Sequence, residues 1–435
     1  MQEGAIMELL DIIQANNLAD LFVMGNFGIE KEGLRATPQA RLAKTLHPKS
    51  LLSPELINCI QTDYGEAMPE LITPPLSPYT ETHKFLANLS QTLINSLPSD
   101  EYMWPFSMPC NLPSDDEILI SQSSDAEVME YREYTARKYG KSRQLVTGIH
   151  INFSLSDTFL SSLFAVQDKY KTVEDLRDNL YLKLTSNYLR YEWFMVYLFG
   201  ASPVAADDFY NAPYFKDMSI PTQAMRSIRN SKYGFNNVAE IEVRYDSVEK
   251  YVSDLRSWVD RGYLRKEREY YANVRLKGKS KDTESLLENG IIYLEFRSFD
   301  NNPYHASGLT IESLEFIHLF LLTLLLLPTK ASAEEIITAD LLKETVAEEH
   351  PLARTVAYME GKWLCTQMSH VAEKLKLAED NQMLIKRALE LLDKPELTIS
   401  ARILQDLNRY TFCELGEKLG QEHRHEQLIF VRDKF

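Results

Sequence analysis

The stretch GIIYLEFRSFD at 290–300 alternates, between positions 292 and 297, apolar residues with the polar or charged residues Tyr293, Glu295 and Arg297. In a β-strand, side chains at alternate positions point to opposite faces of the sheet. The stretch therefore predicts a strand with one apolar face and one polar face. Glu295 and Arg297 share the polar face, two residues apart.

Three other stretches in the first 300 residues have the same character. NFGIEKEGLR (26–35), TDYGEAMPELITPP (62–75) and LVTGIHINFSL (145–155) are short, rich in β-branched or aromatic residues, and bounded by turn residues. A half-solvated antiparallel sheet explains any one of them. Together they repeat an unusual polar set, which consists mainly of carboxylates: Glu30, Glu32, Asp63, Glu66, Glu70, His150 and Asn152.

These polar faces indicate a shared cation site. If the strands line one concavity, two carboxylates about 4 Å apart repel each other by roughly 4 kcal/mol at an effective dielectric constant near 20. Cations would have to hold such groups together, and an oxygen-rich set with one histidine suits Mg²⁺ or Mn²⁺ better than a structural zinc. Carboxylate-held magnesium commonly serves substrate phosphates, so the sequence favours nucleotide-dependent chemistry.

Composition excludes several classes of protein. The 435 residues contain 47 Lys+Arg and 63 Asp+Glu, which gives a net charge of −16. The hydrophobic share of 44% is typical of a globular chain and excludes a disordered one. Since the chain is acidic and has no run of basic residues, we expect no nucleic-acid partner.

Cysteine usage and hydropathy predict a cytoplasmic protein. The four cysteines are far apart in the sequence and form neither C-x-x-C nor a zinc-type cluster: Cys59, Cys110, Cys365 and Cys413. The N-terminus has no basic region followed by a long apolar stretch, so we expect no signal peptide. The most apolar segment, 316–327, is too short to span a bilayer and predicts a core helix.

The order of elements favours an α+β fold. Helical periodicity predicts helices over 1–20, 157–200, 247–270 and 309–327, inserted among the strand-like stretches. Helix continues from Ser332 to the C-terminus, beginning with a capping pattern. No repeat or flexible linker divides the chain, so we predict a catalytic core over 1–330 and a helical region over 331–435 packed on it.

Common signature motifs are missing or incomplete. YGKS at 139–142 ends like a phosphate-binding loop, but Thr135 occupies the position of its first glycine. No G-x-G-x-x-G, H-E-x-x-H or G-x-S-x-G occurs, which argues against Rossmann dehydrogenases, zinc proteases and α/β-hydrolases. HRHE at 423–426 lies in a charged tail and indicates a solvated helix.

Candidate cations for phosphates or acidic substrates are few. They lie in aromatic or strand-like surroundings: Arg226, Arg229, Arg275 and Arg297. Arg297 is the strongest candidate because it shares a strand face with Glu295. The alternative for each is a surface ion pair.

Seven motifs in order carry a resemblance to a known family. They are FGIEKEGLR (27–35), TDYGEAMPELITP (62–74), MWPFSMPC (103–110), TGIHINFS (147–154), SIRNSKYGF (227–235), YYANVRLKG (270–278) and YLEFRSFDNNPY (293–304). Together they resemble glutamate–cysteine ligase of the bacterial type, also called γ-glutamylcysteine synthetase. SIRNSKYGF and VRLKG are most similar to the ligase half of the bifunctional glutathione-synthesising form.

The resemblance implies a fold and an activity. The fold is a curved, mostly antiparallel sheet that forms a funnel, related to glutamine synthetase and surrounded by helices. The activity is ATP-dependent ligation of L-cysteine to the γ-carboxylate of L-glutamate through γ-glutamyl phosphate, with Mg²⁺ or Mn²⁺, as the first step of glutathione biosynthesis. A monomer or a homodimer is expected.

The resemblance also assigns residues motif by motif. The metal-binding set is Glu30, Glu32, Asp63, Glu70, His150 and Glu295. Arg229 and Arg297 are implied to contact glutamate or the transferring phosphate, and Asn152 and Glu66 belong to the cofactor-binding set. Residues implied to shape the amino-acid pockets are Tyr64, Tyr131, Arg132 and Phe235.

Two alternatives stay open at this point. The acceptor of the glutamyl group is either cysteine or another amine, because acceptor pockets differ by one or two side chains. A paralogue that binds glutamate or nucleotide without turnover is the other alternative, which the intact carboxylates disfavour. Because the sequence ends at Phe435 without a glycine-rich grasp loop, we expect no glycine-adding second step.

Overall fold

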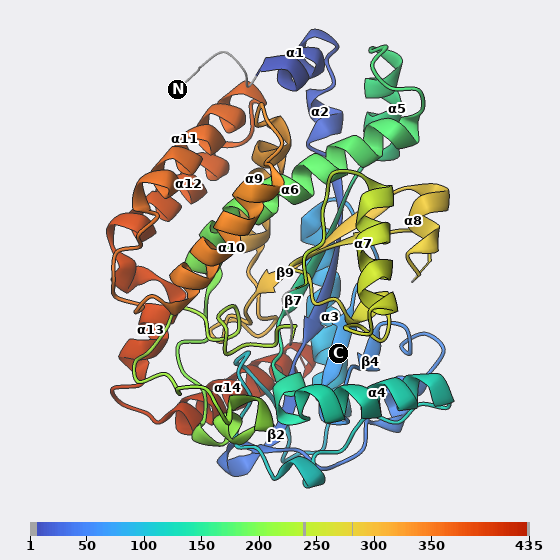
Figure 1. The fold of residues 1–435 in the computed structure, drawn as a ribbon. Helices are drawn as coiled ribbons and strands as arrows, with labels where there is room; N and C mark the ends of the chain where they lie inside the picture. The colour runs from blue at the N-terminus through green and yellow to red at the C-terminus, as the bar shows by residue number, and fades with distance from the viewer. Residues whose placement is uncertain (1–6, 238–240, 281, 433–435) are drawn as a thin grey trace.

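The computed structural model describes residues 7–237, 241–280 and 282–432, and its centre is a six-stranded sheet (Figure 1). The strand order is β4-β5-β1-β7-β9-β8, and every neighbouring pair is antiparallel. The strands are β1 (Gly25–Glu32), β4 (Ile60–Thr62), β5 (Pro69–Ile72), β7 (Ile149–Leu155), β8 (Val274–Lys277) and β9 (Tyr293–Phe299). The predicted α+β class with an antiparallel sheet is confirmed.

A second, three-stranded sheet extends from the first. Its order is β3-β2-β6, and the strands are β2 (Leu34–Thr37), β3 (Arg41–Leu42) and β6 (Tyr102–Trp104). Gly33 separates β1 from β2, so the predicted strand at 26–35 is in fact two strands in two sheets. A Cβ at Gly33 would lie 2.8 Å from the methyl group of Met103, which favours glycine at this change of sheet.

The register of the central sheet sets polar residues opposite one another. Glu30 pairs with His150, Glu32 pairs with Glu70, and Asn152 pairs with Glu295. On the other face, the apolar residues of the same strands are fully buried: Phe27, Ile29, Ile151, Phe153, Leu294 and Phe296. The alternation expected from the sequence is therefore present in β1, β7 and β9.

Three long helices cover the apolar face. They are α3 (Tyr79–Ser96), α6 (Val173–Phe199) and α9 (Ile311–Leu326). Helix α3 packs on β1, α6 packs on β9, and α9 packs on both helices. The apolar segment expected to be a core helix is α9, and among the described residues no helix is long and apolar enough to cross a bilayer.

The predicted helix at 157–200 is two helices. Helix α5 (Asp157–Ala165) ends before α6 begins at Val173. The hydroxyl of Thr172 accepts a hydrogen bond from the backbone of Asp175 and caps α6. A threonine at this position starts a new helix because it satisfies a free N–H group of the first turn.

The remaining helices of the first 330 residues surround the sheet. They are α1 (Met7–Ala15), α2 (Ala19–Phe22), α4 (Ala126–Tyr139), α7 (Val248–Asp260) and α8 (Glu284–Asn289). Residues 1–6 of the predicted N-terminal helix lie outside the described residues. The helix predicted to reach residue 270 ends at Asp260, and Gly262 follows with a φ of 76°.

Short 3-10 helices occupy several of the connections. They lie at Pro38–Ala40, Lys49–Leu52, Asp115–Glu117, Ser142–Leu145, Asp207–Asn211, Pro213–Phe215, Glu267–Glu269 and Pro395–Leu397. Two of these segments, Ser142–Leu145 and Glu267–Glu269, contribute residues to the cavity on the polar face of the central sheet.

The C-terminal residues form five helices. They are α10 (Ala333–Glu348), α11 (Tyr358–Lys374), α12 (Glu379–Asp393), α13 (Ile399–Asp406) and α14 (Phe412–Arg432). Ser332 and Glu335 form the expected capping box of α10. Helix α10 lies along α6, α11 and α12 pack on α9, and α14 returns to β6 and α3 (Figure 1). The division of the chain at residue 330 stays a prediction.

Candidate active site

The polar face of the central sheet lines a cavity of about 560 Å³. Strands β1, β5, β7, β8 and β9 form its floor, and α4, the segment 229–236 and α10 form its walls. Twelve residues predicted from the sequence line it: Glu30, Glu32, Asp63, Tyr64, Glu70, Tyr131, Arg132, His150, Arg229, Phe235, Glu295 and Arg297. Segments more than 260 residues apart in sequence thus converge on one site.

His150 lies at the centre of the carboxylate cluster. Its Nδ1 is 3.3 Å from Glu30 Oε2 and 3.7 Å from Glu295 Oε1, and its Nε2 is 3.5 Å from Glu32 Oε1. One ligand atom each of Glu30, Glu70 and His150 lie within 4.8 Å of one another. This spacing suits three groups that share one small cation.

Burial and neighbouring carboxylates favour the protonated forms of Glu32 and Glu70. Burial and the charge of Asp63 raise the pKa of Glu32 to about 8. The same two causes raise the pKa of Glu70 well above its usual range. Carboxyl groups in this state hold protons that a divalent cation would replace, so the donor set fits Mg²⁺ or Mn²⁺.

His150 is in the form that ligates metals. Burial and the charge of Arg297 lower the pKa of its imidazole to about 4. The ring is therefore neutral at physiological pH and offers a lone pair.

Glu295 has a different electrostatic environment from Glu32. Burial opposes its ionisation, but Arg297, Lys277 and Arg275 together hold the pKa of Glu295 well below its usual range. Lys277 Nζ is 2.5 Å from Glu295 Oε2, and Arg297 forms an ion pair with Glu295 Oε1. One side of the cavity is thus acidic and the other side is rich in cations.

Arg229 is held against the sheet by a hydrogen bond to backbone and by the side chain of Asp300. Its Nη2 donates to the carbonyl of Arg297 at 2.8 Å, and its Nη1 is 3.9 Å from Asp300 Oδ1. A Cβ at Gly148 would lie 2.2 Å from the same Nη2, so only glycine leaves room for this guanidinium. Arg229 and Arg297 consequently lie side by side in the cavity wall.

The predicted amino-acid pocket residues form the outer part of the cavity. Arg132 donates to the carbonyls of Asp63 and Ser121, each at 2.6 Å, so it positions the segment that carries Asp63. The ring of Phe235 packs edge-on against Tyr271 at a centroid distance of 4.4 Å. The roles assigned to these residues stay predictions.

Two predicted site residues lie outside the lining. Glu66 is in the turn between β4 and β5, where strand alternation does not apply, and its carboxylate accepts a hydrogen bond from the backbone N–H of His47 at 2.7 Å. Asn152 donates to Glu30 Oε1 at 2.9 Å and so orients a cluster member.

Sequence reasoning missed several lining residues: Asn230, Arg268, Tyr271, Asn273, Lys277 and Lys343. Lys277 follows Arg275 by two positions on β8, so strand alternation puts both residues on the same face and could have identified Lys277. Lys343 lies on α10, with its side chain only 12% exposed and its Nζ 2.7 Å from Asp340 Oδ1. Nothing in the charged pattern of α10 distinguishes this lysine.

Of the other arginines considered, Arg275 lines the cavity and Arg226 does not. Arg226 is fully buried. Its guanidinium donates to Glu349 Oε2 at 3.0 Å and to the backbone carbonyl of Pro351, in the segment before α11. The surface ion pair considered for Arg226 is therefore wrong, because this guanidinium is a buried link between two parts of the chain.

A family model described as glutamate-cysteine ligase matches residues 10–264 and 258–343. The chain belongs to the glutamate–cysteine ligase family. The match covers the strands of the cavity floor and reaches Lys343 on α10. The resemblance found in the seven motifs is confirmed.

Curated relatives carry the name glutathione biosynthesis bifunctional protein GshAB. The protein of Pasteurella multocida is 37% identical over 421 residues, and that of Streptococcus mutans is 36% identical over 421 residues. Both alignments cover 96% of this chain, but 55% and 54% of the relatives. The chain therefore spans about half the length of the curated relatives it matches.

Two solved structures share the fold. The bifunctional glutathione synthetase of Pasteurella multocida has a TM-score of 0.89 at 36% identity, covering 96% of this chain and 55% of its own. A glutamate–cysteine ligase of Francisella tularensis, solved in complex with AMP, has a TM-score of 0.82 at 24% identity, covering 93% of this chain and 89% of its own.

Proposed function

We propose that this chain ligates L-cysteine to the γ-carboxylate of L-glutamate with ATP, through γ-glutamyl phosphate. The observation that carries the proposal is the carboxylate–histidine cluster beside Arg229 and Arg297, in one cavity of a glutamate–cysteine ligase family member. The product is γ-glutamylcysteine, which places the reaction at the start of glutathione synthesis.

The division of charge in the cavity fits phosphoryl transfer. Glu30, Glu32, Asp63, Glu70 and His150 would hold Mg²⁺ or Mn²⁺, with Glu295 completing the set. A divalent cation in this position supplies charge that offsets the phosphate oxygens of ATP. The AMP complex of the Francisella tularensis enzyme supports a nucleotide in this fold.

The arginines act on the transferring group. The γ-carboxylate of glutamate attacks the γ-phosphorus of ATP, a new P–O bond forms, and ADP leaves. Arg297 and Arg229 neutralise the charge that spreads over the phosphoryl oxygens during this step. Because both guanidiniums are already fixed by Glu295 and by the backbone, little reorganisation is needed.

The second step forms the amide bond. The neutral amine of the acceptor attacks the acyl carbon of γ-glutamyl phosphate, and phosphate leaves with the bond electrons. The amine proton passes to an ionised carboxylate of the cavity that does not hold the cation. The aromatic wall of Tyr64, Tyr131 and Phe235 would contact the amino-acid substrates.

The proposal is tested by measuring ADP release with ATP, Mg²⁺ and L-glutamate, with L-cysteine and then a panel of other amino acids and amines added. Mass detection identifies each product. Turnover that depends on cysteine supports the proposal. Turnover only with another amine would assign a different γ-glutamyl ligase, and no turnover with any acceptor would indicate a binding paralogue.

A further inference from the structure

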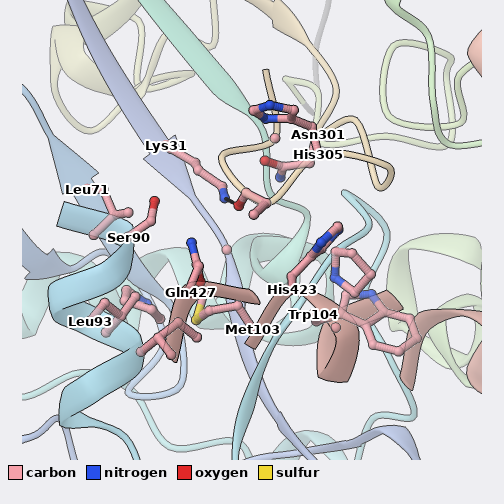
Figure 2. Close-up of a pocket in the computed structure, with 17 residues that line it drawn as sticks. Lys31, Leu71, Ser90, Leu93, Met103, Trp104, Asn301, His305, His423 and Gln427 are labelled. Carbon is pink, nitrogen blue, oxygen red and sulfur yellow. Dashed lines mark hydrogen bonds between the residues drawn. The ribbon is translucent and has the colours of Figure 1, made fainter. Parts of the chain in front are cut away.

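A second, smaller cavity (Figure 2) lies on the face of β1 that carries Lys31, opposite the face that carries Glu30 and Glu32. Lys31, between Glu30 and Glu32 in sequence, points into it, as strand alternation requires. We call it the reverse-face pocket. Its walls come from β1, β5, α3, the segment 301–308 and α14, and its lining includes Lys31, Ser90, Trp104, Asn301, His423 and Gln427.

Lys31 is the one lysine or arginine among the described residues that line the pocket. None of its described lining residues is aspartate or glutamate, although the chain has a net charge of −16. The ammonium of Lys31 donates to the carbonyl of Ala306 at 2.8 Å, which leaves two of its hydrogens for other acceptors. Gln427 and His423 point toward the same space (Figure 2).

Two buried polar atoms of lining residues have no hydrogen-bond partner among the residues that the structure describes. Asn301 Nδ2 donates to the carbonyl of Glu32 at 3.1 Å, which fixes the amide and leaves Oδ1 without a donor. His423 Nε2 donates to the carbonyl of Pro303 at 2.8 Å, which leaves its buried Nδ1 without a partner in the described part of the chain. Asn301 is 3% exposed, and an unpaired acceptor buried to this extent is costly.

A third buried polar atom of the pocket is in the same state as Asn301 Oδ1 and His423 Nδ1. Ser90 lines the pocket, and its buried Oγ has no hydrogen-bond partner within the described residues. The exposed carboxylate of Glu426 lies 3.8 Å from His423 Nδ1, which is beyond hydrogen-bond distance. An occupant must therefore offer acceptor oxygens to Lys31 and a donor hydrogen to Asn301 or His423.

The size of the space limits the occupant. The volume open to the centres of water-sized molecules is about 30 Å³. This is room for roughly two or three such molecules, or for one group of about four non-hydrogen atoms. A nucleotide or a peptide is excluded.

We propose that the reverse-face pocket binds a small oxyanion that retains a hydroxyl hydrogen, of the size of hydrogencarbonate. Lys31 and the amide of Gln427 donate to its charged oxygens. Its hydroxyl group donates to Asn301 Oδ1 or His423 Nδ1. This site is separate from the large cavity and does not depend on the ligase activity proposed above.

Hydrogencarbonate and nitrate test the proposal as a matched pair, since both are planar monoanions of four non-hydrogen atoms and only hydrogencarbonate carries a hydrogen. The thermal unfolding midpoint of the full chain is measured against each anion at equal pH and ionic strength. We expect a saturable rise with hydrogencarbonate, half-complete at about 1 mM. Nitrate should be about tenfold weaker, because it leaves the buried acceptors unpaired. Equal effects of the two anions would overturn the proposal.

Variants locate the effect within the molecule. Gln427→Glu places a negative charge in the pocket, and Lys31→Met removes the cation while keeping the side-chain length, so either change should abolish the hydrogencarbonate response. Gln421→Glu makes the same change on an exposed position of α14 and should leave it intact. A response that survives both pocket variants contradicts the proposal.

A crystal structure of the full chain with hydrogencarbonate provides the second readout. We expect planar density beside Lys31 Nζ, within hydrogen-bond distance of Asn301 Oδ1 or His423 Nδ1. Separate water molecules in the pocket, or anion density only in the large cavity, would overturn the proposal.

Discussion

Glu32 and Glu295 lie in the same cavity but have opposite electrostatic surroundings. Burial and Asp63 raise the pKa of Glu32 to about 8, so in the metal-free protein at pH 7 this group is mostly protonated. Glu295 is ionised, because Arg297, Lys277 and Arg275 outweigh the effect of its burial. The two carboxyl groups should therefore respond differently to the same substitution.

Glu32→Gln replaces a protonated carboxyl group with a neutral amide of the same shape. We expect the metal-free stability at pH 7 to change by less than about 0.5 kcal/mol. Glu295→Gln removes a buried partner of three cations and should cost about 3 kcal/mol. Both variants should lose turnover, at least about a hundredfold. Chemical denaturation measures the stabilities, and equal losses in the two variants would contradict the charge assignment.

The raised pKa of Glu32 also predicts how stability depends on pH. Its folded pKa of about 8 lies above the ordinary value of 4.5, so its contribution is fully present below about pH 4.5 and is lost as pH rises toward 8. The metal-free protein should lose up to about 1.4 kcal/mol per pH unit from this group. Glu70, with the same direction of shift, adds to the slope.

Bound Mg²⁺ should oppose the loss of stability with rising pH, because it replaces the protons on Glu32 and Glu70. Thermal unfolding scans should show a larger Mg²⁺-dependent rise in the midpoint at pH 8.5 than at pH 6. A rise that is independent of pH would indicate that the cation binds elsewhere.

Helix α10 supplies one charged residue to the wall of a cavity whose floor is the central sheet. Lys343 lines the cavity from α10, which packs along α6. We expect Lys343→Met to raise the KM for ATP or glutamate about tenfold, with a smaller change in kcat, since its charge would act on bound substrate. Lys362→Met, an exposed change on α11, is the matched control and should leave both constants unchanged.

The strands of the cavity floor could be predicted because alternation is a local property. It identified Glu30, Glu32, His150, Glu295 and Arg297 as a polar set before their register was known. Glu66 was grouped with Glu70 by the same rule, but the chain turns between β4 and β5 and points Glu66 toward His47. Which residues of a helix meet the cavity depends on packing, so Lys343 gave no signal in the sequence.

The order of motifs was sufficient to identify the family, but not the extent of the folded unit. Helices α11 and α12 cover α9, in which 11 of the 16 residues are buried. Arg226 adds a buried ion pair with Glu349 across the two regions. The helical region after residue 330 therefore shares its core with the sheet domain.

Removal of residues 331–435 tests this shared core. The truncated chain would expose the apolar surfaces of α6 and α9, so we expect it to aggregate or to unfold without cooperativity. Size-exclusion chromatography and circular dichroism compare it with the full chain. A monomeric, cooperatively folded fragment would show that the C-terminal helices are an independent unit.

The central claim for the whole molecule is that the charged cavity makes a γ-glutamyl bond. The most direct measurement is mass detection of γ-glutamylcysteine in a mixture of ATP, Mg²⁺, L-glutamate and L-cysteine, with the full chain and with Glu32→Gln in parallel. We expect product from the full chain, formed with one ADP per bond, and almost none from the variant. The same yield from both proteins, or ADP release without any γ-glutamyl product, would contradict the claim.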